Sequence, residues 1–218
     1  VDGIPSAMAA FQGRLLAGVG SGLRLYVCGK KKLLKKCECK RIPTFVVALQ
    51  TLGDRIYAGD ASESLHYLKY KPAENTIVPY ADDIIPRYTT ALQLLDYDTV
   101  AGADKFGNFF ICRLPKEVSR EIEEDPTGGR IEGRLHSAPF KVEDLVCYHV
   151  GDTVTALQRA SLQPGAKECV LYATVMGEVG ALHPFTSRED VDFFSHLEMH
   201  LRQEAPPLCG RDHLAFRS

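Results

Sequence analysis

Two histidines near the end of the chain have the spacing of a helical metal site. His196 and His200 are four residues apart, which places both imidazoles on one face of a helix, and Cys209 and His213 follow. Such a set could bind Zn²⁺. However, the spacing matches no standard zinc finger, and no Cys-x-x-Cys pair precedes it. We interpret these residues as surface or packing side chains, and we predict no metal site and no cofactor.

Two other patterns resemble functional sites only in part. Gly18, Gly20 and Gly22 are spaced as in a phosphate-binding loop, but such a loop must open a helix, and residues 23–27 alternate as a strand does. Asp82, Asp83 and the acidic run 121–125 supply carboxylates without a recognisable nucleophile or base beside them. We interpret them as solvated loop residues. No Ser–His–Asp or Cys–His signature is present, so we predict no catalytic residue and no enzyme.

A basic segment follows Gly29 and is the strongest candidate for binding a partner. Its seven cations, in twelve positions, are Lys30, Lys31, Lys32, Lys35, Lys36, Lys40 and Arg41. Such a run could neutralise phosphates or meet an acidic protein surface. The alternative is a hairpin whose charged solvent face protects an exposed edge strand from aggregation. Both interpretations remain open, and a phosphate or partner contact is the functional one.

The composition limits the classes of protein that this chain can represent. The 218 residues are 45% hydrophobic, with 26 Lys and Arg against 28 Asp and Glu, which gives a net charge of −2. This balance excludes a strongly basic nucleic-acid binder as a description of the whole chain. No apolar run reaches the roughly 20 residues that a membrane-spanning helix needs. We therefore expect no membrane association and no small-molecule substrate.

The cysteines and the chain ends add two further expectations. Seven cysteines at irregular spacing favour reduced thiols in a cytosolic or nuclear protein over a disulfide framework. The chain starts at Val1 without an initiator Met and stops just after an apolar stretch. We therefore expect a fragment of a longer protein.

An internal repeat organises the elements that position these residues. Leu16-Ala17-Gly18, Tyr57-Ala58-Gly59 and Val100-Ala101-Gly102 recur 41 and then 43 residues apart, and a fourth, partial copy begins at Ala156. Each period alternates with the two-residue repeat of strands. Four strands in about 40–45 residues are typical of a β-propeller blade. We predict an all-β fold, namely about four four-stranded blades of a larger propeller followed by a helix.

The predicted strands cover most of the chain. They are residues 7–11, 14–19, 23–28, 33–39, 44–51, 55–60, 64–69, 76–81, 88–95, 99–104, 109–114, 141–150, 152–159, 168–174 and 179–185. The predicted blades occupy 1–186. A helix near 188–203 follows, with Ser187 as its capping residue and apolar side chains at helical spacing. Residues 187–218 are thus predicted to form a helix and the truncated start of a further helical domain.

An insertion at about 115–140 interrupts the third period. It holds many charged, Gly and Pro residues and few large apolar ones, so we expect a mobile or partner-ordered loop that buries little. Trypsin is expected to cut the isolated chain first near Arg130 or Arg134.

An open arc of blades should expose an apolar face at each end. We expect Phe11, Leu15 and Leu16 at one end, and Leu182 and Phe185 at the other, to lose their partners. Exposed apolar patches drive association, so the chain alone is expected to self-associate.

Several longer motifs carry a resemblance to a known family. They are Leu94–Asn108, Glu124–Gly128, Tyr148–Val154, Pro184–Asp190 and Pro206–Ser218. With them, nearly the whole chain resembles the C-terminal region of the large propeller subunits of RNA-processing and DNA-repair scaffolds. That family has members in the SF3b complex of the U2 snRNP, in the cleavage and polyadenylation machinery and in cullin ligases. The likeness is greatest to the SF3b member.

The resemblance implies a fold, a function and partners. It implies three propellers of seven blades each and a C-terminal helical domain, in a nuclear, non-catalytic scaffold of pre-mRNA splicing. The implied partners are the large helical-repeat subunit and the small subunits of SF3b, with the U2 snRNP and pre-mRNA contacted mostly indirectly. The alternative is a propeller that binds RNA or another nucleic acid directly, in a different RNA-processing or DNA-repair scaffold.

Overall fold

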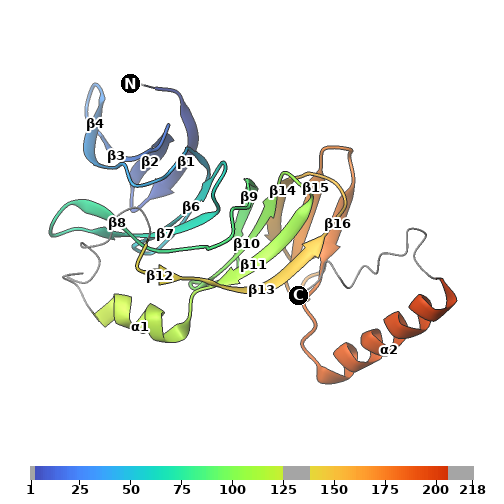
Figure 1. The fold of residues 1–218 in the computed structure, drawn as a ribbon. Helices are drawn as coiled ribbons and strands as arrows, with labels where there is room; N and C mark the ends of the chain where they lie inside the picture. Colours follow the sequence, from blue (N-terminus) through green and yellow to red (C-terminus); the bar gives the residue numbers. More distant parts are fainter. Residues whose placement is uncertain (1–2, 125–137, 206–218) are drawn as a thin grey trace.

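The described residues fold into four small sheets, antiparallel apart from one short strand, and two helices (Figure 1). The computed structural model describes residues 3–124 and 138–205. The strands are β1 (Pro5–Phe11), β2 (Arg14–Val19), β3 (Gly22–Cys28), β4 (Leu33–Cys39), β5 (Val46–Leu52), β6 (Arg55–Asp60), β7 (Leu65–Lys71), β8 (Thr76–Asp82), β9 (Thr89–Leu94), β10 (Thr99–Asp104), β11 (Asn108–Arg113), β12 (Phe140–Lys141), β13 (Glu143–His149), β14 (Val154–Ala160), β15 (Cys169–Thr174) and β16 (Val179–Leu182). The helices are α1 (Lys116–Glu124) and α2 (Arg188–Glu204).

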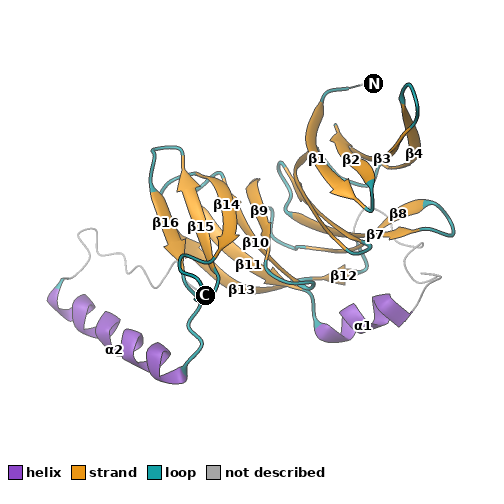
Figure 2. Cartoon of the chain, turned by 180° about the vertical axis from the view of Figure 1, so that it is seen from behind, coloured by secondary structure: helices purple, strands orange, loops and turns teal. Residues whose placement is uncertain are grey.

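The four sheets are arranged like the blades of a propeller, as predicted. The first sheet has the order β1-β2-β3-β4, the second β5-β6-β7-β8 with β12 added outside β8, the third β9-β10-β11-β13 and the fourth β14-β15-β16. The first strands of successive sheets, β1, β5, β9 and β14, contact one another. The first and fourth sheets lie at opposite ends of the resulting arc (Figures 1 and 2). The fourth sheet has three strands rather than four.

The repeated glycine explains how closely the sheets approach. Gly18 and Gly59 occupy the same place in the second strand of their sheets. A Cβ at Gly18 would lie 2.7 Å from the Cβ of Val46, in the first strand of the next sheet. A Cβ at Gly59 would lie 3.0 Å from side-chain atoms of Thr89 and Leu92, again in the next sheet. The first two copies of the repeat therefore mark sites where neighbouring sheets leave no room for a side chain.

Apolar clusters fill the spaces between successive sheets. Phe11 and Leu16 are 1% and 0% exposed and pack in the cluster between the first two sheets. The expectation that they lose their partners is therefore wrong, because these side chains point toward the second sheet and not toward the free end. Phe185, by contrast, is 54% exposed, as expected. Phe45, which precedes β5 of an inner sheet, is 47% exposed.

The predicted insertion is more ordered than its composition suggested. Residues 116–124 form α1, whose Ile122 is buried in the cluster between the second and third sheets. Phe140 and Lys141 form β12, which pairs in parallel with Ala81 and Asp82 of β8. The expectation of a loop over 115–140 is therefore wrong for residues 116–124 and 140–141. The averaged composition concealed a short amphipathic helix. Arg130 and Arg134 lie outside the described residues, so their cleavage stays a prediction.

The second helix begins where the sequence predicted. The side chain of Ser187 accepts a hydrogen bond of 3.2 Å from the backbone N–H of Asp190 and so caps α2. No residue of α2 is buried, and both views place the helix apart from the sheets (Figures 1 and 2). Among the residues that the structure describes, neither helix has the length and apolar character needed to cross a membrane.

Candidate functional site

The predicted basic residues lie together on one hairpin at the outer rim of the first sheet. We name residues 29–41 the basic hairpin. Its turn is closed by a hydrogen bond of 3.0 Å from the Gly29 N–H to the Lys32 carbonyl. All seven cations of the predicted site are exposed. The structure therefore brings the predicted residues into one surface patch.

One carboxylate stands within this patch and is already paired. Glu38 accepts hydrogen bonds from Arg24 Nε at 2.7 Å and from Lys35 Nζ at 3.0 Å. These two bonds, the one from Arg24 above all, lower the pKa of Glu38 to about 2. Glu38 thus stays ionised at neutral pH and neutralises Lys35. The other six cations of the hairpin form no ion pair with Glu38.

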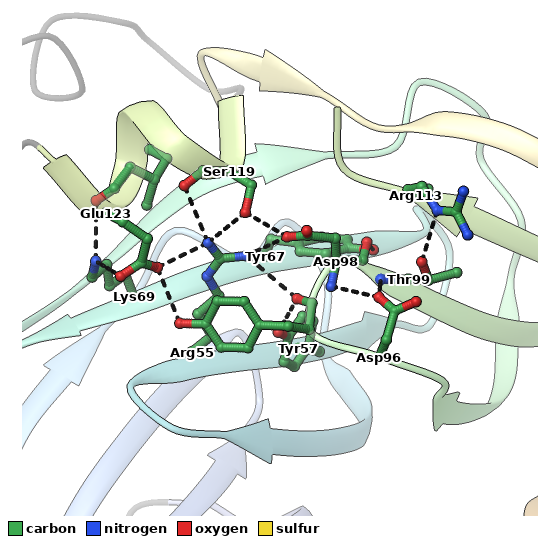
Figure 3. A network of polar contacts seen from close by, with 12 residues as sticks. Arg55, Tyr57, Tyr67, Lys69, Asp96, Asp98, Thr99, Arg113, Ser119 and Glu123 are labelled. Atoms are coloured by element: carbon green, nitrogen blue, oxygen red, sulfur yellow. Dashed lines mark hydrogen bonds and ion pairs between the residues drawn. The ribbon is translucent and has the colours of Figure 1, made fainter. Parts of the chain in front are cut away.

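A buried arginine that the sequence interpretation missed joins the second sheet, the third sheet and α1 (Figure 3). Arg55 is fully buried. Its guanidinium donates to Asp98 Oδ1 at 2.8 Å, to Ser119 Oγ at 3.0 Å and to Glu123 Oε1 at 2.9 Å. It also stacks 3.9 Å from the centre of the Tyr97 ring. From β6, one cation thereby satisfies partners in two other elements, the β9–β10 loop and α1.

Neighbouring side chains extend this network and fasten α1 to the sheets. Lys69 Nζ donates to the Ile122 carbonyl at 3.0 Å, and the Tyr57 hydroxyl donates to the Tyr97 carbonyl at 2.6 Å (Figure 3). Burial raises the pKa of Tyr57 above its ordinary value, so the phenol stays protonated. These hydrogen bonds tie α1 and the β9–β10 loop to the second sheet, so the network braces the fold.

A second polar cluster lies beside the third sheet. Arg87 donates through Nε to Asp83 at 2.6 Å and also pairs with Asp144, while its guanidinium stacks 4.3 Å from the Phe110 ring centre. Cys112 Sγ lies 3.2 Å from Asp144 Oδ1. Asp82 and Asp83, expected as solvated loop residues, are thus in structural contacts. Asp82 ends β8, is buried, and pairs with Lys141.

This cluster contains the one group of possible metal ligands found among residues 3–124 and 138–205. Atoms of Asp83, Cys112 and Asp144 lie within 4.8 Å of one another. Arg87 already bridges both carboxylates, so their charge is compensated without a cation. His196 and His200 are exposed on α2, and Cys209 and His213 lie outside the described residues. We therefore interpret the cluster as a brace between sheet and loop.

The cysteines should differ sharply in reactivity, which provides a test of this packing. The six described cysteines are free. Burial, and then the carboxylates of Asp83 and Asp144, raise the pKa of the Cys112 thiol, whereas Cys28 is exposed. Because the thiolate is the reactive form, iodoacetamide at pH 8 should alkylate Cys28 first and spare Cys112 until the protein unfolds. Mass spectrometry of timed samples measures this. Equal rates at both positions would contradict the described packing.

A largely apolar groove of about 790 Å³ separates the third and fourth sheets. Phe109, Ile111, Val146 and Leu182 contribute to its walls, and Arg159 forms an ion pair with Glu168 at its rim. The charges of Arg159 and Glu168 thus compensate each other at the rim of the groove. The groove therefore has the character of a packing surface more than that of a reaction site.

The sequence matches one protein family and several named proteins along its whole length. Residues 1–218 match the CPSF A subunit region family. The chain belongs to this family. It is 60% identical over its whole length to Spliceosome-associated protein 130 A of Arabidopsis thaliana and 54% identical to Splicing factor 3B subunit 3 of Drosophila melanogaster. It is also 43% identical to Pre-mRNA-splicing factor prp12 of Schizosaccharomyces pombe, again over its whole length.

These relatives are longer than the chain and are named for splicing. The chain spans about 18% of the length of each of these three proteins. The resemblance that the motifs indicated is therefore confirmed, and it extends across the four sheets and α2.

Proposed function

We propose that this chain is part of a non-catalytic scaffold subunit of the SF3b complex of the U2 snRNP, which acts in pre-mRNA splicing through protein–protein contacts in the nucleus. The observation that carries this proposal is the 43–60% identity, over the whole chain, to proteins named as splicing factors. A likeness of this extent includes the surfaces of the blades as well as their cores.

The chemistry of the described residues supports a scaffold role. Arg55 and Arg87 are compensated by carboxylates, and Cys112 is buried with its pKa raised by that burial. Catalytic groups normally combine a perturbed pKa with access to a substrate. Here the perturbed groups connect sheets to one another, which is the arrangement that a rigid support requires.

The proposal includes an organisation and partners. Residues 1–186 are blades of a larger, seven-bladed propeller, and 187–218 begin a C-terminal helical domain. The loops and strand edges of the blades would contact the large helical-repeat subunit and the small subunits of SF3b, and these would mediate most contacts with U2 snRNA and pre-mRNA.

Affinity purification of the tagged full-length protein tests this function. We expect U2 snRNA and a large helical-repeat protein to co-purify in near-stoichiometric amounts, and to remain after extensive washing. Ribonuclease treatment should remove the RNA and leave the protein partner bound. Purification with polyadenylation or ubiquitin-ligase components, and without U2 snRNA, would contradict the proposal.

A further inference from the structure

The basic hairpin carries positive charge that the described part of the protein does not neutralise. It holds seven cations and one carboxylate, and that carboxylate, Glu38, already pairs with Arg24 and Lys35. Lys30, Lys31 and Lys32 form no ion pair with any residue in 3–124 or 138–205. Three adjacent ammonium groups at an exposed turn therefore lack a counter-charge there.

The strand that follows these lysines has an open edge. β4 is the outermost strand of the first sheet and pairs only with β3 among the described strands. Asn75 donates to the Lys36 carbonyl at 2.8 Å, so the middle of the edge is covered from the second sheet. Leu33–Lys35 lie on the hairpin side of that contact, and the hairpin projects beyond the sheets (Figure 1). An edge of this kind is a template for another extended chain.

The same fold already adds a strand at the equivalent edge of the second sheet. β8 is the outermost of the first four strands there, and β12 pairs with it. This addition is accompanied by an ion pair between Lys141 of the added strand and Asp82 of the edge strand. Edge addition with matched charges is thus a contact that these blades accommodate.

The surface favours a peptide over a nucleic acid. Residues 29–41 contain no aromatic side chain on which a base could stack, and stacking is the usual means of holding single-stranded RNA. Leu33 and Leu34 are 50% and 49% exposed beside the lysines, which suits apolar side chains of a partner.

We propose that the basic hairpin binds an extended acidic segment of a partner protein, which pairs with the β4 edge at Leu33–Lys35 while its carboxylates meet Lys30, Lys31 and Lys32. This surface deepens the proposed scaffold function and rests on it, since it specifies one kind of partner. The lysines also disfavour pairing with a second copy of the same hairpin, because like charges would then face each other.

Binding of a synthetic peptide to the full-length protein tests the proposal. The probe is a ten-residue peptide of alternating glutamate and valine, followed by fluorescence anisotropy at low salt. Lys30→Gln/Lys31→Gln/Lys32→Gln should weaken binding roughly tenfold or more through loss of charge attraction. The matched control, Lys116→Gln/Arg120→Gln/Lys167→Gln, removes the same charge from exposed positions elsewhere and should leave binding unchanged.

Methylated peptides separate strand pairing from charge attraction alone. Alternate amides of a strand face the same edge. Of two peptides N-methylated either at every glutamate or at every valine, one should therefore lose about tenfold or more in affinity, and the other should bind much as the parent does. The double variant Leu33→Ser/Leu34→Ser should bind the unmethylated parent peptide more weakly than the wild-type protein does.

Several outcomes would overturn the proposal. One is that both methylated peptides bind equally, and another is that the two triple variants behave alike. A third is that oligouridine binds more tightly than the peptide and depends on the three lysines, which would assign the hairpin to RNA. If the lysine variant binds the peptide as tightly as wild type does, while U2 snRNA still co-purifies with the wild-type protein, the scaffold function stands and only the hairpin proposal is rejected.

Discussion

Replacing Arg55 with Met is expected to loosen α1 and the junction between the second and third sheets. The fully buried guanidinium bonds to Asp98, Ser119 and Glu123, so its removal leaves two carboxylates and a hydroxyl without their cation. Loss of one partner of a buried ion pair costs about 3–5 kcal/mol. We expect about 3 kcal/mol, the lower end, because Asp98 and Glu123 keep some contact with water.

Hydrogen exchange of the full-length protein measures this effect locally. Amides of α1 should lose their protection, and those of β6 should exchange roughly a hundredfold faster. Arg55→Lys keeps the charge but loses the two-pronged geometry. Its amide exchange rates should therefore lie between those of the wild-type protein and of Arg55→Met. Glu123→Gln removes the most exposed partner and should cost less than about 1 kcal/mol. Equal effects of Arg55→Met and Glu123→Gln would show that the network does not depend on Arg55.

The second large effect is expected at Gly102, where alanine has no room. Gly102 of β10 lies opposite Phe110 of β11, and a Cβ at this glycine would overlap the Phe110 ring. Phe110 is fully buried, and the guanidinium of Arg87 lies over its ring. Overpacking of a rigid core typically lowers the free energy of unfolding by about 1–3 kcal/mol. We expect Gly102→Ala to lower it by about 3 kcal/mol.

Gly180 supplies the matched control for this prediction. It faces Tyr172 across β15 and β16, and a Cβ there would overlap the tyrosine ring just as at Gly102. Tyr172, however, borders the groove between the third and fourth sheets and is only partly buried, so its ring can move aside. Gly180→Ala should therefore cost less than about 1 kcal/mol.

Pulse proteolysis in urea compares the two variants through the concentration at which each becomes cleavable. Phe110→Leu should recover part of the loss in the Gly102→Ala background, since it removes the ring that clashes. Additive losses in the double variant, or a Gly180→Ala variant as unstable as Gly102→Ala, would contradict the packing described for β10 and β11.

The strand order was predictable because the sequence repeats its own signals. Two-residue alternation and the Ala-Gly pairs fix the second strand of each of the first three sheets, and 55–60 and 99–104 agree with β6 and β10 at both ends. Gly18 and Gly59 are informative because the next sheet occupies the space of the missing side chain, whereas at Gly102 the ring of Phe110 in the same sheet occupies it.

The helix α1 and the two arginine networks were not predicted, for different reasons. The four-residue spacing of Val118 and Ile122 was a signal for α1, but it was diluted by the charged residues around it. Arg55 pairs with Asp98, 43 residues away, and such a pair depends on how sheets meet. The sequence held a weak signal, since Arg14 and Arg55 begin equivalent strands, β2 and β6. In the structure Arg14 lies over the ring of Tyr70, and Arg55 lies over that of Tyr97.

The basic hairpin illustrates what sequence and structure each contribute. The sequence located all seven cations, but it could not distinguish a solvated hairpin from a binding surface. The structure adds the open edge at Leu33–Lys35 and the pairing of Glu38 with Arg24. Neither follows from charge counting, because both depend on the register of β3 against β4.

The most direct test of the scaffold account compares splicing with assembly in one experiment. A nuclear extract depleted of the endogenous protein is supplied with full-length wild-type protein, with Cys112→Ala or with Asp144→Asn, and both spliced RNA and bound U2 snRNA are measured. The account predicts that splicing follows the amount of assembled complex for every variant, because these side chains brace the fold and perform no chemistry. A variant that assembles as wild type does but splices at a small fraction of the wild-type rate would contradict it.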